Sequence, residues 1–455
     1  MKTMAAAIAL TACLSISAQA PSPESKLIFT SSDSVLQSAF DWAKPMALSY
    51  SHGEGDPVGP WCEAALPQRE AFCIRDVCHQ SIGAHLLGLT AQNKNMMDKF
   101  VGNISQSRDL CTFWELDRHD RPAPIDYRSD EEFWYNLNAN FDIIHTAWKL
   151  YNWTADADYI SRNDYTEFYR ISLDGYLDRW MLRPDNIMDR KRIMNRPESV
   201  MPDNQFYACR GIPSYVESEG DICAGLDLIA SIYAGHAAAA KIAAANGSHG
   251  QAKKLNKTAS KYRKLVNDKW WDAEANRFNT SWTENQTFSY GEGIPFALWF
   301  GITDDTAKVD GCVNSILSRD WNIENMSYFP AILFDNGYPE QAYDLIGKIP
   351  SMPRSEYPEV SFGMIEALIR CGMGIAPETD GYKITTEHRI PDANCVLSAY
   401  NIPLFDGHID LTHNGKSSSE ITNNTSRAIL WTPILKGKAH DPISVAPGKT
   451  ISISI

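Results

Sequence analysis

The sequence predicts a mainly α protein in which a double-layered helical barrel precedes a small all-β domain. From about residue 34 to residue 374, apolar residues recur at helical spacing, whereas short β-rich runs separated by turn residues fill 382–455. Within the helical region, helices with one apolar face alternate with helices that are apolar nearly all round. We count about twelve helices, and six inner and six outer ones account for the alternation. The sequence has no repeat of fixed period, which disfavours a helical solenoid.

The first twenty residues predict a signal peptide. Lys2 supplies a positive charge, residues 4–16 an apolar run, and residues 18–20 a small-x-small cleavage site. The run ending at Cys13 resembles a bacterial lipobox, so lipidation of Cys13 is the alternative to ordinary cleavage. We therefore expect an exported protein, periplasmic or secreted, or anchored by lipid. The apolar run is too short to cross a bilayer, and we expect no later transmembrane segment.

The two kinds of helix are clearest in five segments. Residues 251–271 and 165–182 carry one apolar stripe, which is typical of helices with one face in water. Residues 222–245, 294–302 and 360–373 are apolar on nearly all sides, so we expect them to be buried.

The C-terminal region predicts strands. The expected strands are 396–400, 408–412, 428–431 and 450–455, with turn formers such as Asn414-Gly415 between them. A run of turn formers at 376–378 marks the boundary. We thus expect three parts: a signal peptide (1–20), a helical barrel (28–376) and a β domain (377–455).

Composition excludes several classes of function. A formal net charge of −14 disfavours binding to nucleic acid, which requires basic surface. The nine cysteines after the signal are odd in number and scattered, which is not a disulfide scaffold, although one or two bridges remain open. The sequence lacks CxxC, HExxH, G-x-S-x-G, P-loop and G-x-G-x-x-G motifs. We expect neither a metal nor a cofactor.

Loops dense in acidic and aromatic residues precede the apolar helices. If the inner helices run parallel, these loops meet at one end of the barrel and form one cavity. Each carboxylate alone is explained well by helix capping. Capping does not explain three carboxylates within five residues at Glu217, Glu219 and Asp221, nor the accompanying Trp and Tyr residues. A carboxylate-rich, aromatic-walled cavity suits glycoside cleavage, which uses one carboxyl group as acid and another as base or nucleophile.

Two motifs resemble the six-hairpin glycosidase superfamily. They are residues 66–70 (LPQRE), continuing to Arg75-Asp76, and residues 356–362 (EYPEVSF), leading to 372–377 (GMGIAP). The resemblance covers nearly the whole mature chain. It implies an (α/α)6 toroid barrel followed by a C-terminal β-sandwich, as in bacterial α-L-rhamnosidase-like members.

The resemblance also implies an inverting mechanism, with a general acid before the sixth helix and a general base before the twelfth. On this chain the acid is Glu219 or Glu217, and the base is Glu359 or Glu356, with Glu219 and Glu359 preferred. The residues expected to bind sugar hydroxyls or to stack on sugar rings are Trp61, Glu63, Arg69, Arg75, Asp76, Glu132, Trp134, Asp221, Tyr290, Glu292 and Tyr357. We expect His79 to be a core residue.

These expectations describe an exo-acting, metal-independent glycosidase that acts on a poly- or oligosaccharide, with rhamnosidase-like specificity only weakly preferred. The chain lacks the large N-terminal β domains of rhamnosidases, so the sugar stays open. A polysaccharide lyase or unsaturated-uronyl hydrolase on the same barrel is a first alternative, favoured by Arg69, Arg75 and Arg210. A non-catalytic carbohydrate-binding protein is a second. The sequence leaves the linkage and the oligomeric state open.

Overall fold

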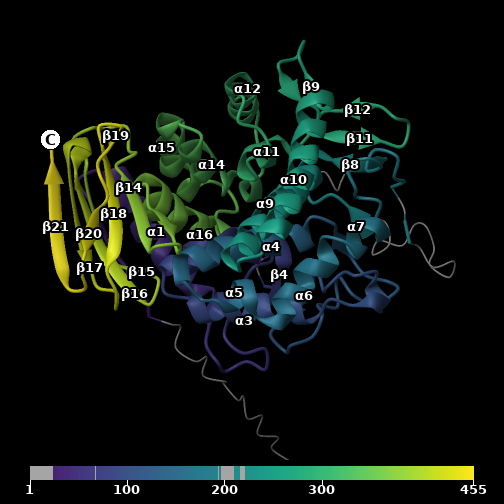
Figure 1. The fold of residues 1–455 in the computed structure, drawn as a ribbon, viewed down its shortest axis with the longest axis horizontal. Helices are drawn as coiled ribbons and strands as arrows, with labels where there is room; N and C mark the ends of the chain where they lie inside the picture. The colour runs from purple at the N-terminus through teal and green to yellow at the C-terminus, as the bar shows by residue number, and fades with distance from the viewer. Residues whose placement is uncertain (1–23, 67, 193, 196–209, 216–220) are drawn as a thin grey trace, which may run out of the picture.

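The protein consists of a helical domain and a β domain that lie side by side (Figure 1). The computed structural model describes residues 24–66, 68–192, 194–195, 210–215 and 221–455. Figure 1 shows the strands of the β domain on one side and the helices on the other.

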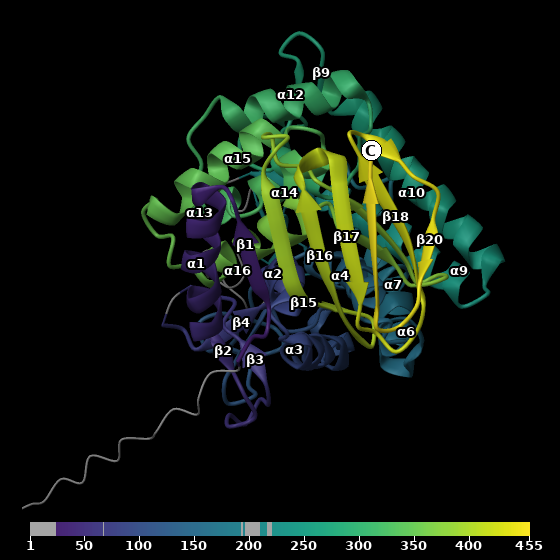
Figure 2. The same cartoon turned by 90° about the vertical axis from the view of Figure 1, so that its left-hand side faces the viewer.

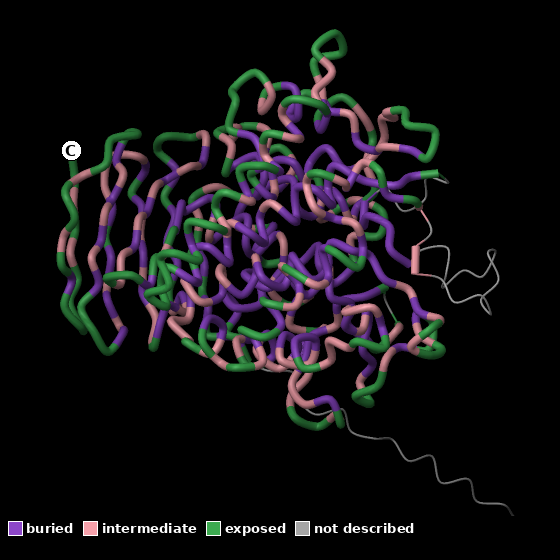
Figure 3. Tube along the Cα trace, turned by 45° about the vertical axis from the view of Figure 1, so that its right-hand side comes forward, coloured by how far each residue is buried: buried purple, intermediate pink, exposed green. Residues whose placement is uncertain are grey.

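Within the described residues, six helices of the helical domain are buried along nearly their whole length, and we call them the inner helices. They are α2 (Ile74–Leu86), α4 (Ala139–Thr154), α9 (Leu226–Ala245), α11 (Ile294–Trp299), α14 (Phe329–Asp335) and α16 (Pro358–Glu366), which continues as a π-helical segment, Ala367–Gly372. Each contacts the next in this order, and α16 in turn contacts α2. The burial pattern places the core among these helices (Figure 3).

The outer layer consists of helices with one buried face. They are α1 (Ser34–Ser49), α3 (Thr90–Gly102), α6 (Asn163–Ser172), α10 (His249–Lys269), α12 (Thr306–Leu317) and α15 (Pro339–Lys348). The longest, α10, buries only Ala252, Ala259, Tyr262 and Val266 and packs on α9. Shorter helices complete the domain: α5 (Asp158–Ser161), α7 (Gly175–Arg179) and α13 (Ile323–Met326).

The loops of the helical domain contain short strands. These are β2 (Ser51–His52), β3 (Trp61–Cys62), β4 (Ala71–Cys73), β5 (Glu115–Asp117), β6 (Tyr135–Asn136), β7 (Arg210–Ile212), β8 (Ile222–Gly225), β9 (Trp271–Asp272), β10 (Arg277–Phe278), β11 (Ser281–Thr283) and β12 (Phe288–Ser289). Two of the expected helices therefore differ from the structure. The segment 222–245 begins with β8, because residues 222–225 pair with β11, and the segment 165–182 is divided between α6 and α7.

The β domain contains two sheets, and in Figure 2 it faces the viewer. One has the strand order β1 (Ile28–Ser31), β15 (Val396–Leu404), β16 (Gly407–Asn414), β17 (Ser418–Asn423) and β21 (Lys449–Ser454). The other contains β13 (Ala376–Glu378), β14 (Lys383–Glu387), β18 (Ile429–Leu435) and β19 (Lys438–Ala439), with β20 (Ile443–Val445) also paired to β18. Buried and partly exposed residues alternate along β16 and β18, so each sheet buries one face. Trp431 lies fully buried in this core.

Residues 28–31 do not belong to the helical domain, where the sequence analysis assigns them. They form β1, which pairs with β15 from Ile28 opposite Tyr400 to Ser31 opposite Leu397. The reason is long-range pairing, which a four-residue run beside a helix start does not reveal. The helix α1 begins only after Asp33, whose carboxylate accepts the backbone N–H groups of residues 35 and 36.

The helix α9 is the only helix of the described residues that is long and apolar enough to cross a membrane, which is compatible with the expectation of no transmembrane segment. Most of it is buried in the protein, in contact with α4, α10 and α11. The eight cysteines that the structure describes are free, and Cys209 lies outside the described residues.

The contact between α2 and α16 depends on Gly83. A Cβ at this position would lie 2.0 Å from the backbone oxygen of Phe362. We expect Gly83→Ala to force the two helices apart and to lower the free energy of unfolding by about 1–3 kcal/mol or more, because overpacking strains a tight core. Thermal unfolding measures this effect. The matched control is Gly102→Ala at the end of α3, where a Cβ meets open space; equal melting temperatures for the two variants would contradict the close packing.

Candidate active site

Two adjoining cavities lie at the N-terminal ends of the inner helices. The first has a volume of about 350 Å³, and its wall consists of Ala65, Leu66, Arg69, Cys73, Arg75, Asp76, Trp114, Glu115, Ile125, Asp126, Trp134, Glu324, Tyr357 and Glu359. The second, of about 230 Å³, shares Arg75 and Glu324 with it and adds Ser214, Tyr215, Glu292, Asn322, Asn325 and Tyr328. Segments far apart in the sequence thus contribute carboxylates and aromatic rings to one place.

Glu359 lies in the first turn of α16, directly after Pro358 at the helix start. Its side chain is buried, with 3% of the residue exposed, and its Oε2 atom has no hydrogen-bond partner within the residues that the structure describes. Burial raises the pKa of Glu359 well above its usual range, and the negative charges of Asp76 and Glu324 raise it further. The protonated form of Glu359 is therefore favoured in the empty cavity.

Asp76 is an acceptor of hydrogen bonds beside Glu359. It lies in the first turn of α2, where its Oδ1 accepts from Nε of Arg75 at 3.2 Å and its Oδ2 accepts from Sγ of Cys73 at 3.1 Å. The guanidinium of Arg75 also lies over the rings of Trp114 and Tyr215, 5.7 and 5.3 Å from their centroids. This arrangement fixes the positions of a cation and a carboxylate at the junction of the two cavities.

A second group of carboxyls lies across the first cavity. Arg69 donates from Nη1 to Oε2 of Glu115 at 3.0 Å and lies 4.0 Å from Oδ2 of Asp126. Burial, with the hydrogen bond to Asp126, raises the pKa of Glu115 to about 9, and burial also raises the pKa of Asp126. At neutral pH this pair retains a proton.

The loop that carries Arg69 has an unusual backbone. Gln68 and Glu70 on either side of it have φ values of 73° and 49°. Left-handed φ is strained for residues other than glycine and is concentrated at functional sites. The strain is consistent with a loop held in place to direct Arg69 at Glu115.

Glu324 and Tyr215 form the wall of the second cavity. Burial raises the pKa of Glu324, which is shared by both cavities. The hydroxyl of Tyr215 hydrogen-bonds to the ring of His79, whose Nδ1 atom is 2.9 Å away. Burial lowers the pKa of His79 well below its usual range, so this residue is a neutral core histidine, as the sequence predicts.

The structure brings seven of the expected site residues to the cavities. Arg69, Arg75, Asp76, Trp134, Tyr357 and Glu359 line the first cavity, and Glu292 lines the second. Trp134 is partly exposed there, and its Nε1 donates to Oδ1 of Asn136 at 3.3 Å. Its ring is thus oriented and accessible to a ligand.

Trp61 and Tyr290 lie elsewhere. Trp61 has no exposed surface: its ring stacks on His52 and its Nε1 donates to Asp56 at 2.8 Å. It therefore cannot stack on a sugar, and the expectation for it is corrected. The ring of Tyr290 is covered by the guanidinium of Arg277, 3.5 Å from the ring centroid. Tyr290 also contributes nothing to the wall of either cavity.

Four expected carboxylates also lie outside the two cavities. Glu132 forms an ion pair with Arg128, and Asp221 is exposed. Glu63 accepts from His52 at 3.2 Å. The backbone oxygen of the exposed Glu356 accepts from the hydroxyl of Tyr50.

Glu63, Glu356 and Glu359 are nevertheless near one another. Burial, followed by the charges of these three carboxylates, raises the pKa of Tyr50 to about 12. Glu63 and Glu356 thus lie close enough to Tyr50 to act on it, although neither lines a cavity.

Glu217 and Glu219 lie outside the described residues, so the structure does not place them. The chain enters that segment from Ser214 and Tyr215, which line the second cavity. Within the described ranges, no group of three His, Cys, Asp or Glu residues is arranged to hold a metal ion.

The sequence analysis missed Trp114, Glu115 and Asp126. They belong to the long loop before α4, which also contains the acidic and aromatic run at 130–135. Glu324 and Tyr328 precede α14, and they were recognisable as members of the loop pattern, although they were not chosen as site residues.

Comparison with known proteins finds the same fold in several solved structures. No protein-family model matches the sequence, and no curated protein matches it. Among solved structures, the chain is similar to an α-L-rhamnosidase from Dictyoglumus thermophilum (TM-score 0.62, 14% identity, 94% of this chain and 50% of that one).

Two further solved structures share the fold. One is an α-L-rhamnosidase from Aspergillus terreus (TM-score 0.58, 11% identity, 96% of this chain and 51% of that one). The other is a putative kojibiose phosphorylase from the human microbiome (TM-score 0.57, 11% identity, 95% of this chain and 67% of that one). The chain spans about half the length of these rhamnosidases. At these identities the similarity shows the fold alone.

Proposed function

We propose that this protein is a glycoside hydrolase that removes a terminal sugar from a poly- or oligosaccharide with inversion at the anomeric carbon. The observation that carries the proposal is the buried carboxyl of Glu359 in an aromatic-walled cavity beside Asp76, where burial raises its pKa. Acid–base cleavage of a glycosidic bond requires a carboxyl group that holds a proton and a second carboxyl group near it, and a raised pKa suits Glu359 to the first role.

The helical domain is proposed to be an (α/α)6 barrel and the β domain a β-sandwich. The order of contacts from α2 to α16 and back to α2 supports a closed ring. A ring of parallel inner helices explains why their N-terminal loops meet around the two cavities. A site enclosed by such loops suits exo-action, because the end of a saccharide enters it more readily than the middle.

Glu359 is proposed to be the proton donor. The resemblance to six-hairpin glycosidases assigned it the role of base, but its raised pKa favours the acid. The base is then Glu219, with Glu217 as its alternative, both from the loop before α9. Arg75, Asp76 and Glu324 bind sugar hydroxyls, and Trp134 and Tyr357 cover ring faces.

Because two α-L-rhamnosidases share the fold, we propose rhamnosides as the first candidate substrates. The test is hydrolysis of a panel of aryl glycosides, followed by NMR of the first anomer released. Release of one sugar with inverted configuration supports the proposal. Turnover that requires added phosphate would contradict hydrolysis and indicate a phosphorylase, a reaction named for one protein of this fold.

The pH dependence of activity tests the role of Glu359. A proton donor loses activity as the pH rises through its pKa. Asp76→Asn removes a charge that raises the pKa of Glu359. We therefore expect the alkaline limb of the kcat/KM profile to move to lower pH, by about one to three units.

The control for this shift is Glu70→Gln. Glu70 is exposed and forms an ion pair with Arg118 outside the cavity, so its loss should leave the limb in place. An alkaline limb at the same pH in Asp76→Asn and the wild type would show that Glu359 is not the donor.

A lyase or unsaturated-uronyl hydrolase is the second candidate, because Arg69 and Arg75 line the first cavity and are suited to an acidic sugar. Both, however, already contact carboxylates, which leaves less of their charge for a ligand. Arg210, the third arginine that favoured this alternative in the sequence, is buried beside Asp109 and does not line the cavity. A rise in ultraviolet absorbance on a uronate polymer would favour the lyase. Under either activity we propose an exported protein, on the strength of the signal-like residues 1–20.

A further inference from the structure

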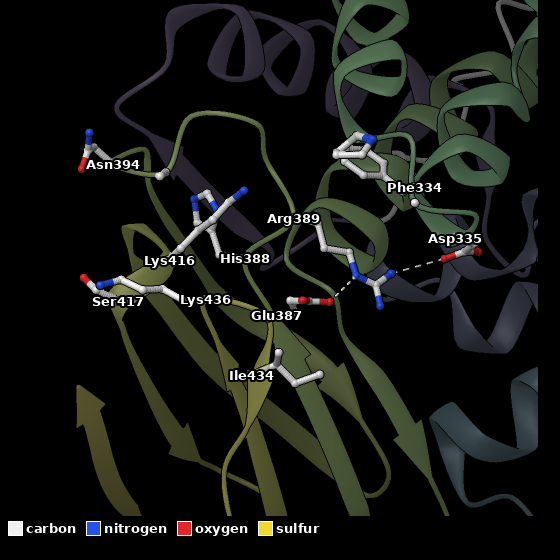
Figure 4. Close-up of a pocket in the computed structure, with 14 residues that line it drawn as sticks. Phe334, Asp335, Glu387, His388, Arg389, Asn394, Lys416, Ser417, Ile434 and Lys436 are labelled. Atoms are coloured by element: carbon white, nitrogen blue, oxygen red, sulfur yellow. Dashed lines mark hydrogen bonds and ion pairs between the residues drawn. The ribbon is translucent and has the colours of Figure 1, made fainter. Parts of the chain in front are cut away.

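A larger pocket, of about 850 Å³, lies between the helical domain and the β domain (Figure 4). We call it the interdomain pocket. Phe334 and Pro339 line it from the helical side, and His388, Arg389, Lys416 and Lys436 line it from the strand side. It shares no lining residue with the two cavities of the candidate active site.

The acidic groups of the interdomain pocket are already neutralised. Arg389 donates from Nε to Glu387 at 3.0 Å, and its Nη1 lies 3.5 Å from Oδ1 of Asp335, as Figure 4 shows. Asp335 also accepts two hydrogen bonds from Arg370, at 3.1 and 2.9 Å. These carboxylates therefore need no further cation.

Two lysines in the same pocket are left without a counter-charge. Lys416 and Lys436 form no ion pair with any residue in the described part of the chain. Their turns are joined, because the backbone N–H of Lys436 donates to the backbone oxygen of Lys416 at 2.9 Å. Gly415, at φ +61°, holds its turn so tightly that a Cβ would lie 2.4 Å from the oxygen of Ala393. In a chain with a net charge of −14, two lysines without a counter-charge on joined turns form a positive site that can attract an anion.

His388 indicates that a ligand of this pocket also carries a hydrogen-bond donor. It is 4% exposed, and its Nε2 lies 2.8 Å from the backbone oxygen of Cys395, so Nε2 carries the proton and donates. Burial lowers the pKa of His388, as does the nearby Lys416, which favours the neutral ring. Its Nδ1 is then an acceptor, and it is buried without a partner among the residues described. An acceptor of this kind is satisfied by a hydroxyl group.

We propose that the interdomain pocket binds an anionic sugar. The carboxylate or sulfate of the sugar contacts Lys416 and Lys436, one hydroxyl donates to Nδ1 of His388, and the partly exposed Ile434 provides apolar surface for the ring. Such a site retains a charged saccharide on the protein apart from the active site. It goes beyond the proposed hydrolase activity and does not depend on it.

Calorimetric titration of the full-length protein tests the proposal. The ligands are tetragalacturonate as the carboxylated probe, a sulfated oligosaccharide of similar length, and an uncharged cello-oligosaccharide. We expect one of the charged ligands to bind, and Lys416→Gln or Lys436→Gln each to weaken it about tenfold, because each removes a charge-assisted hydrogen bond. Lys438→Gln is the matched control, since Lys438 is exposed on the same hairpin but does not line the pocket.

The outcomes distinguish a uronate from a sulfated sugar, and they distinguish binding in the interdomain pocket from binding elsewhere. Binding of tetragalacturonate alone identifies a uronate, and binding of the sulfated ligand alone identifies a sulfated sugar. Unchanged affinity in both lysine variants would place the ligand in the active site and overturn the proposal. Equal binding of the uncharged ligand, binding of inorganic phosphate or sulfate only, or no binding at all would also overturn it.

Discussion

Glu359→Gln is expected to lower kcat by about 10²–10⁴-fold and to leave the melting temperature unchanged or higher. The amide has the shape of the carboxyl but donates no usable proton to a leaving oxygen. Stability should persist because the buried carboxyl already favours its neutral form, so the substitution replaces one neutral group by another. Repulsion from Asp76 also disappears.

Leaving-group dependence identifies the role of Glu359. A missing proton donor matters little for an aryl glycoside with an acidic phenol and greatly for a natural alcohol leaving group. Kinetics with both substrates, together with thermal unfolding, measure this difference. The matched control is Glu356→Gln, three residues earlier and exposed, which should retain most of the activity. Full activity of Glu359→Gln on the natural substrate would exclude Glu359 from catalysis.

Glu219→Gln is expected to lower kcat by a similar factor, about 10²–10⁴-fold, if Glu219 is the base. The attacking water then lacks a group to accept its proton. Added azide, a nucleophile that needs no base, should restore part of the turnover. Because Glu217 is the alternative base, Glu217→Gln is measured in parallel, and the larger loss with azide rescue identifies the base.

Other results for these variants would assign the roles of acid and base differently. If Glu219→Gln shows the leaving-group dependence and Glu359→Gln the azide rescue, the roles are those that the resemblance first implied. If Glu219→Gln and Glu217→Gln both keep full activity, the loop before α9 does not supply the base.

The general architecture was predictable because the spacing of apolar residues within each short segment indicates whether that segment forms a helix or a strand. The apolar segment at 294–302 contains α11, the one at 360–373 overlaps most of α16, and the run at 396–400 begins β15. The strand β1 was not predictable, because its pairing with β15 joins the two ends of the chain. The polar strand β17 (Ser418–Asn423) was also missed, since it lacks a strong apolar alternation.

The site was predictable in part for the same reason. Helix starts are recognisable from sequence. The sequence therefore predicted that Asp76 and Glu359 lie in the first turns of α2 and α16. The sequence does not reveal which aromatic rings are covered. Trp61 and Trp134 both precede inner helices, yet Trp61 is fully buried while Trp134 is partly exposed at the cavity.

The pairing of Glu115 with Asp126 depends on tertiary structure. These residues are not part of a dense acidic run, and only the fold brings them to Arg69. The raised pKa of Glu359 is likewise a consequence of burial, and it is the reason why we propose the role of acid instead of the role of base that the resemblance implied.

The most direct test of the central claim is a crystal structure of Glu359→Gln with an oligosaccharide substrate. We predict that the terminal sugar occupies the first cavity, against Trp134, with its glycosidic oxygen beside the amide at position 359 and its hydroxyls at Arg75 and Asp76. A sugar bound at another surface, with the cavity of Glu324 and Glu359 empty, would contradict the account.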